Sequence, residues 1–171
     1  MTDWLHILLN AFWCGCAAVG FGVLFNSPKR TLPAIYVCGF VAGSVKYFIL
    51  HPDTGGGVII ASLIAASVIG FISIPLSHKV HVPPIILSIP AVIPLVPGTF
   101  AYRTMLGLIR FVNHSEAEVL TGMVHYGIMT LFVIMALSIG VTLPMLLLRI
   151  ESTKNVRLLS KKAREQKRFN L

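Results

Sequence analysis

Apolar residues come in five long runs, separated by short polar stretches. The runs cover residues 4–25, 32–50, 58–76, 85–112 and 119–148. Each run is close to or above the about 20 residues that an α-helix needs to cross a hydrocarbon core of about 30 Å. The pattern therefore predicts an all-α polytopic membrane protein. We expect a transmembrane helical bundle over residues 1–150 and a basic cytoplasmic tail over residues 151–171.

The fourth run contains residues that break helices. These are Pro90, Pro94, Pro97 and Gly98. Each proline removes a backbone N–H and frees a carbonyl about one turn earlier. Opened backbone at membrane depth is tolerated only where protein or a watery cavity satisfies the freed groups. Two interpretations follow, a path for a transported substrate or a proline kink that only shapes packing, and we favour the path.

The charges between the runs predict an orientation. Lys29 and Arg30 follow the first run, Lys79 follows the third, and a basic tail follows the fifth. The loops after the second and fourth runs carry acidic residues instead, with Arg110 as the nearby exception. Because cytoplasmic loops are rich in Lys and Arg, the N-terminus should be outside and the C-terminus inside. This alternation requires the fourth run to cross once, as a broken span and not as a re-entrant hairpin.

Composition and charge agree with this picture. Hydrophobic residues make up 56% and charged residues 12% of the chain, which excludes an ordinary soluble domain. Eight of the fourteen Lys and Arg residues lie at or after Arg149, so the net charge of +8 is concentrated in the tail. Directly after a span, such a tail favours a cytoplasmic anchor near anionic lipid, or docking to a partner, over nucleic acid. Residues 152–168 have a weak apolar side that an interfacial helix would use.

Small residues recur at intervals of four in three of the runs. They are Gly39 and Gly43, then Ser62, Ala66 and Gly70, and finally Ala136 and Gly140. This spacing puts each set on one stripe of a helix, where backbones can approach closely. The stripes predict helix packing in a tight bundle or a homo-oligomer.

Nothing in the sequence points to catalysis, a metal or a cofactor. Cys14 and Cys16 form C-x-C without a companion ligand cluster, and Cys38 lies alone in an apolar run. All six acidic residues fall in termini, loops or the tail, so no pair of carboxylates is available at membrane depth. We therefore expect neither an enzyme nor a cofactor-binding protein.

The residues around the break resemble a known family. Residues 91–102 read AVIPLVPGTFAY, residues 20–34 read GFGVLFNSPKRTLPA, and residues 137–140 read LSIG. These segments resemble the threonine/serine exporter family, and specifically the small, YjjB-type membrane subunit of its split, two-component form. The resemblance covers nearly the whole chain up to about Arg149.

The resemblance implies a component of a secondary exporter in the bacterial inner membrane. Family members export threonine and serine, and the split form is associated with succinate as well. The split form pairs the small subunit with a larger membrane subunit. An odd number of spans independently suggests half of a transporter, because two five-span units commonly build one. The alternative is a non-transporting membrane scaffold or assembly subunit.

The second half of the broken run offers candidate substrate contacts. Thr99 is positioned to cap a new half-helix, whose positive N-terminal end suits a carboxylate. The carbonyls freed near Ile86, Pro90 and Ile93 are candidates to accept from an ammonium group or a water. Threonine, serine and succinate share a carboxylate, so this arrangement fits all three.

Two further candidates, Tyr102 and Arg103, lie about one turn after Thr99. Arg103 inside a span costs about 2.5–3.5 kcal/mol at the helix centre, so it should face a cavity or a partner. It either pairs with a substrate carboxylate in a fork, or it snorkels outward or bonds freed carbonyls. Tyr102 offers a hydroxyl to the path, or else anchors the helix at the interface.

Three polar residues in other runs complete the candidates. Lys46 either snorkels to the outer surface or provides a second cation that lines the path. His125 and Asn10 lie at membrane depth and form a candidate proton or polar relay. The alternative for both is an ordinary hydrogen bond between helices.

Overall fold

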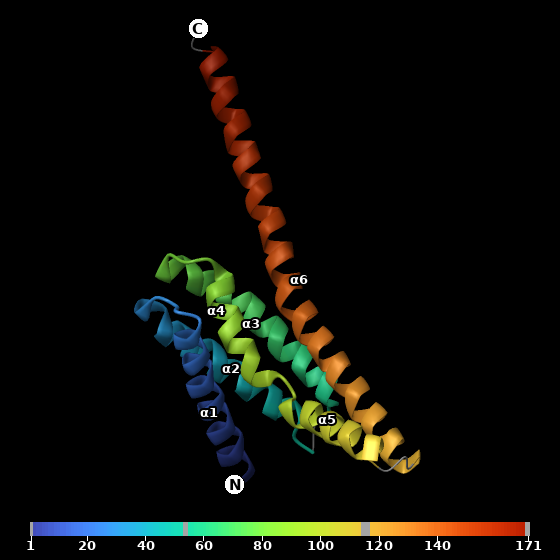
Figure 1. Ribbon diagram of the computed structural model, residues 1–171. Coiled ribbons are helices and arrows are strands. Elements are labelled where there is room, and N and C mark those ends of the chain that lie inside the picture. Colours follow the sequence, from blue (N-terminus) through green and yellow to red (C-terminus); the bar gives the residue numbers. More distant parts are fainter. Residues whose placement is uncertain (1, 53–54, 114–116, 170–171) are drawn as a thin grey trace.

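The computed structural model describes residues 2–52, 55–113 and 117–169, which are helical apart from short turns (Figure 1). The elements in chain order are α1 (Thr2–Leu24), η1 (Lys29–Thr31), α2 (Leu32–Ile49), α3 (Val58–Val80), α4 (Pro84–Val92), η2 (Ile93–Leu95), α5 (Gly98–Asn113) and α6 (Ala117–Phe169). No strand occurs in these residues. The predicted all-α class is confirmed.

Four helices are long and apolar enough to cross a membrane. They are Trp4–Leu24, Lys29–Ile49, Val58–Val80 and Glu118–Leu147. A fifth crossing is made if the pair Pro84–Leu95 and Gly98–Val112 counts as one span, with a bend of 54° between its halves. The elements thus match the five predicted runs, including the break in the fourth.

The two halves of the fourth run continue in the same general direction. In Figure 1, α4 and α5 lead one after the other from the α3–α4 turn toward the start of α6, and the two ends of the chain lie at opposite ends of the bundle. With 1.5 Å per residue and a 54° bend, the two halves together advance about 30 Å, enough for one crossing. A re-entrant hairpin would need a bend well beyond a right angle, so this geometry favours the broken crossing.

Two helices are longer than the sequence pattern suggests. α3 continues to Val80 because nothing breaks it before His81, which ends the helix in a left-handed conformation with φ 56°. α6 continues to Phe169 as a single helix of 53 residues, about 80 Å long, and leaves the bundle in Figure 1. The separate interfacial helix predicted over residues 152–168 is instead the continuation of α6, since no proline or glycine interrupts that segment.

Small residues bring α1 and α2 together. A Cβ placed on Gly39 would lie 2.5 Å from the Cβ of Ala18, and one on Gly43 would lie 2.8 Å from the Cβ of Cys14. Both contacts are shorter than carbon atoms allow, so only glycine permits this approach. The contacts run in opposite directions along the two helices, as expected for an antiparallel pair.

A second close pair is formed by α3 and α6. A Cβ on Gly140 would lie 2.7 Å from the Cβ of Ala66, and one on Gly70 would lie 2.9 Å from Cγ of Pro144. Ser62 and Ala136 are buried on the same two stripes. The contacts advance by four residues on both helices together, so α3 and α6 run parallel.

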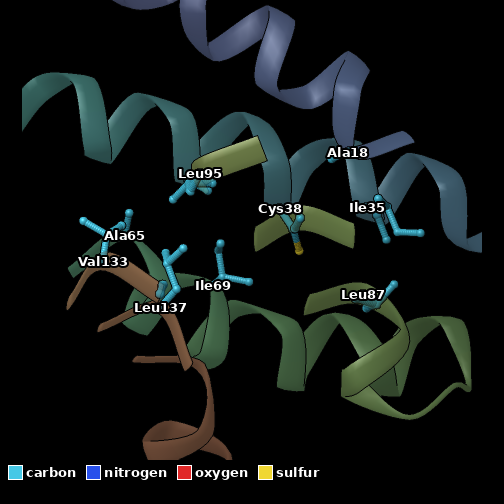
Figure 2. Packing of buried hydrophobic residues seen from close by; sticks show 13 residues of the cluster. Ala18, Ile35, Cys38, Ala65, Ile69, Leu87, Leu95, Val133 and Leu137 are labelled. Carbon is cyan, nitrogen blue, oxygen red and sulfur yellow. The ribbon is translucent and has the colours of Figure 1, made fainter. Parts of the chain in front are cut away.

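The centre of the bundle is filled by α4 and η2. Figure 2 shows Leu87 near Ile35, and Leu95 lies close to the helices that carry Cys38 and Ala65. Leu87 and Leu95 are fully buried. The first half of the broken crossing therefore lies inside the bundle, in contact with α1, α2 and α3, whereas α5 packs chiefly against α6.

Candidate functional site

The break itself is short and partly hydrogen-bonded. After η2, Val96 adopts an extended conformation, and its N–H donates to the carbonyl of Ile93 at 3.0 Å. Pro97 is buried and has no N–H to donate. Helical bonding resumes when the N–H groups of Phe100 and Ala101 donate to the carbonyl of Pro97. The interruption is thus confined to one turn.

Thr99 does not have the capping role that we expected. α5 begins at Gly98, and the first carbonyl of the helix belongs to Pro97. Thr99 therefore lies inside the first turn, where it is exposed and lines a groove between α5 and α6. Pro97 takes the position before the helix, so α5 starts two residues earlier than a cap at Thr99 predicts.

A lysine binds the break from the neighbouring helix. Nζ of Lys46, in the last turn of α2, donates to the carbonyl of Leu95 at 2.6 Å. The interpretation that Lys46 snorkels to the surface is therefore wrong. An ammonium group does reach a freed carbonyl, as the proline pattern suggested, but the acceptor is Leu95. The carbonyl of Ile93, one of those expected, is occupied by the N–H of Val96.

Residues 4–52 and 55–113 contain no carboxylate, so none of them neutralises the charge of Lys46. Its hydrogen bond is to a neutral carbonyl, and its side chain is half-buried. A charge at membrane depth without a counter-charge is costly, and such residues line substrate or ion pathways.

Arg103 lies in a different part of the molecule. Its Nη1 donates to the hydroxyl of Tyr126 on α6 at 3.2 Å, and its guanidinium carbon lies 5.2 Å from the centre of that ring. The side chains of Arg103 and Tyr102 are exposed and line an open groove of about 620 Å³ between α5 and α6. Arg110, two turns further along, lines it too. The structure thus gives Lys46 and Arg103 different helices as neighbours.

Tyr126 is a residue that the sequence did not single out. It follows His125, whose ring packs edge-on against it with centroids 5.6 Å apart. His125 itself is exposed on α6. A tyrosine in an apolar run gives no sign of its partner, because the partner is 23 positions away on another helix.

Asn10 lines a second cavity, between α1 and α2. This cavity measures about 500 Å³, and its other polar side chains are His6, Tyr47 and His51. The spacing of these polar residues in the sequence already indicates that they share helix faces. His6 and Asn10 are four residues apart, as are Tyr47 and His51, so each pair lies on one face of its helix.

Comparison with known proteins gives the family. The family model described as "Threonine/Serine exporter, ThrE" matches residues 10–147 of the chain. The chain belongs to the threonine/serine exporter family. The matched region contains the break and both cations, Lys46 and Arg103. Within this exporter family, the chain is a multi-pass membrane protein, as the apolar runs predicted.

One relative of the chain is an uncharacterized protein of Haemophilus influenzae. The two are 28% identical over 144 residues, which is 84% of this chain and 48% of that protein. The chain thus spans about half the length of the curated relative it matches. No solved structure matches this member of the exporter family.

The described residues hold cationic side chains near the break, at Lys46, and in the groove between α5 and α6, at Arg103, and no cluster that fits a metal. No group of three or more His, Cys, Asp or Glu comes together in this part of the chain. Lysine and arginine side chains are donors without acceptor capacity, so both regions are suited to anions. Of the two, only the Lys46 region touches the interrupted backbone of the fourth crossing.

Proposed function

We propose that this chain is the small membrane subunit of a secondary exporter for small carboxylate metabolites. The substrates are threonine and serine, or dicarboxylates similar to succinate, and the setting is the bacterial inner membrane. The observation that carries the proposal is the broken fourth crossing, whose Leu95 carbonyl is bound by the half-buried Lys46. Irregular backbone inside a bundle is the usual place for substrate in secondary transporters.

The two halves of the crossing support transport by alternating access. α4 and η2 are held among α1, α2 and α3, whereas α5 packs chiefly against α6. The chain between the halves is only Val96 and Pro97, so a change in the 54° bend requires few dihedral angles to move. Movement of α5 with the first part of α6 would then open or close the path at the break.

A larger membrane partner completes the proposed exporter. The chain matches about half the length of its relative, and α5 exposes a line of large apolar side chains. Transporters commonly combine two such units around one central path. The chain's own contribution is binding and gating.

Efflux of labelled substrate tests the proposal. Proteoliposomes that contain this chain and its larger partner are loaded with L-threonine, L-serine or succinate, and efflux is timed. In the variant Pro94→Ala/Pro97→Ala the backbone N–H groups return and the break can close into regular helix. We expect efflux to fall at least about tenfold, by analogy with the large effect of hinge changes on turnover.

The matched control is Pro75→Ala, because Pro75 lies inside α3 on the exposed side and away from the break. It should leave efflux unchanged. The opposite pattern supports the scaffold alternative: normal efflux in the double variant, together with lost efflux when residues 150–171 are removed. The amount of folded protein in the membrane is measured for every variant.

A further inference from the structure

The cavity between the start of α1 and the end of α2 has no role in the function proposed so far. Its polar side chains are His6 and Asn10 from α1, with Tyr47 and His51 from α2. Its volume of about 500 Å³ is ample for a small metabolite with several waters. A polar cavity of this kind between two otherwise apolar spans is unusual, because membrane spans rarely hold polar residues without a purpose.

The helix geometry turns these polar side chains toward one another. α1 and α2 approach closely at Gly43, where a Cβ would lie 3.0 Å from the Cα of Ala11. Asn10 directly precedes Ala11, and Tyr47 follows Gly43 by one turn. The cavity therefore opens where this tight contact ends, and its walls are the two helix faces that continue from it.

Lys46 lies beside the cavity, in the turn of α2 that also carries Tyr47. Asn10 lines the cavity, and Cys14 follows it on the same face of α1, about one turn or 5–6 Å further in. Cys14 packs against α2 at Gly43, where a Cβ would lie 3.1 Å from the sulfur of Cys14, and Lys46 follows Gly43 by three residues. Lys46 also directly precedes Tyr47 in the chain. Lys46 thus connects the turn that lines the cavity with the break, through its hydrogen bond to the carbonyl of Leu95.

The hydrogen bond of Lys46 can be exchanged for a stronger one. Its present acceptor is the neutral carbonyl of Leu95, and residues 4–52 and 55–113 contain no carboxylate that neutralises it. A hydrogen bond between an ammonium group and a carboxylate is roughly twice as strong as one between neutral groups. A ligand that carries a carboxylate would therefore compete well with Leu95 for the ammonium group.

We propose that the cavity is an entrance to the transport path, and that Lys46 receives the carboxylate of the substrate in exchange for the Leu95 carbonyl. The inference rests on the proposed function and adds the substrate's required group and the residue that recognises it. Asn10 and the hydroxyl of Tyr47 are positioned to meet the hydroxyl or amino group of the same ligand. Release of Leu95 frees η2, which links binding to movement of the break.

Ligand-induced thermal stabilisation of the purified complex tests the exchange. The probes are L-threonine, succinate and threoninol, which is threonine with the carboxylate replaced by an alcohol. The wild type should melt at higher temperature with L-threonine and succinate and not with threoninol. In Lys46→Gln the amide can still donate to Leu95 but carries no charge, so half-maximal stabilisation should require at least about tenfold more carboxylate, a loss of about 1.4 kcal/mol.

Two further variants make this result specific. Lys46→Arg keeps the charge and should restore stabilisation at least in part. Lys79→Gln removes a lysine at the exposed end of α3 and should behave as the wild type. Equal stabilisation of Lys46→Gln and the wild type would overturn the inference, and so would equal effects of threonine and threoninol on the wild type. Binding is measured apart from efflux, so a wild-type complex that binds carboxylates without exporting them contradicts only the proposed function.

The cavity has its own test. Tyr47→Phe and Asn10→Ala should each raise the threonine concentration for half-maximal stabilisation by roughly three- to tenfold, as expected for the loss of one hydrogen bond. Tyr36→Phe is the matched control, because Tyr36 lies near the other end of α2 and stacks on Phe40. If Tyr47→Phe and Asn10→Ala both behave like Tyr36→Phe, the cavity is not the entrance, whatever the result at Lys46.

Discussion

The two halves of the fourth crossing differ in their surroundings: several residues of α4 and η2 are buried, whereas none of Gly98–Val112 in α5 is buried. In α4 and η2, Leu87 and Ala91 are 0% exposed and Leu95 is 1% exposed. In α5, Tyr102 is 66% and Val112 is 77% exposed. The first half is therefore surrounded by protein on one face, although Ile85 and Ile89 are exposed on the other, and the second half faces lipid or another subunit over most of its surface. Part of the difference shows in the sequence, because α5 carries Arg103 and Arg110, whereas Ser88 is the one polar side chain of α4 and η2.

The difference has a cause in the neighbouring helices. α4 lies where α1, α2 and α3 converge and contacts all three. α5 has the first part of α6 as its main neighbour, and its closest approach is at Gly107, where a Cβ would lie 2.9 Å from the Cβ of Met123. The molecule thus combines a packed bundle with a two-helix hairpin that has one open side.

The largest effect is expected where a side chain is forced into the packed bundle. In Gly140→Leu the new Cβ would lie 2.8 Å from the backbone carbonyl oxygen of Leu63, which cannot turn aside. We expect the free energy of unfolding to fall by more than about 3 kcal/mol, which is at the upper end of the range for overpacked cores. Thermal unfolding in detergent, followed with a dye that reacts with the thiol of the buried Cys38, measures it.

The hairpin supplies the matched control for this change. Gly122 lies on the same helix, and a Cβ there would meet nothing within 4 Å. Gly122→Leu should therefore melt close to the wild type. A melting temperature as low as that of Gly140→Leu would mean that the hairpin is as tightly packed as the bundle, and the comparison between the two regions would fail.

A smaller effect on stability is expected from a leucine-to-alanine substitution, which can be made in both halves of the crossing and compared. Leu95→Ala removes a buried side chain and leaves a cavity, whereas Leu108→Ala shortens a side chain that is 46% exposed. Because lipid is also apolar, the cost comes mainly from the cavity that the substitution leaves. We expect the free energy of unfolding to fall by about 1–3 kcal/mol for Leu95→Ala and by under about 0.5 kcal/mol for Leu108→Ala. The same melting assay compares them, and equal losses would show that α5 is covered in the isolated chain.

The smallest effect concerns the hydrogen bond within the hairpin. Tyr126→Phe removes the acceptor of Arg103 but keeps the ring under its guanidinium group. Because Arg103 is exposed, we expect a loss of at most about 0.5–1 kcal/mol. Tyr126→Ala removes the ring as well and should cost more. A fall in melting temperature for Tyr126→Phe beyond that of Leu95→Ala would contradict the view of the hairpin as the looser region.

The sequence predicted the helices well and their long-range contacts poorly. The apolar runs and the prolines gave five crossings and the position of the break, because both depend on local composition. The contact between Lys46 and Leu95 joins residues 49 positions apart and depends on how α2 meets η2. No local pattern encodes it, so the sequence left Lys46 with two interpretations.

The predicted helix boundaries were wrong where the sequence has no strong signal for the start or end of a helix. α3 runs on to Val80 because the polar residues after 76 are compatible with a helix, and His81 ends it in a conformation more often taken by glycine. Thr99 has a good residue type for a cap, yet the position is taken by Pro97. In both cases residue preference was a weaker determinant than the backbone around it.

The parallel packing of α3 and α6 has a consequence for how the chain is made. The stripe of Ser62, Ala66 and Gly70 meets α6 at Gly140 and Pro144, which leave the ribosome only after α4 and α5 have been synthesised. Because synthesis proceeds at about 5–20 residues per second, the stripe on α3 stays without its α6 partner for roughly 4–15 s. Nascent chains that stall before α6 therefore present a polar, close-packing surface to lipid. Insertion factors and membrane quality control are the proteins that would meet it first.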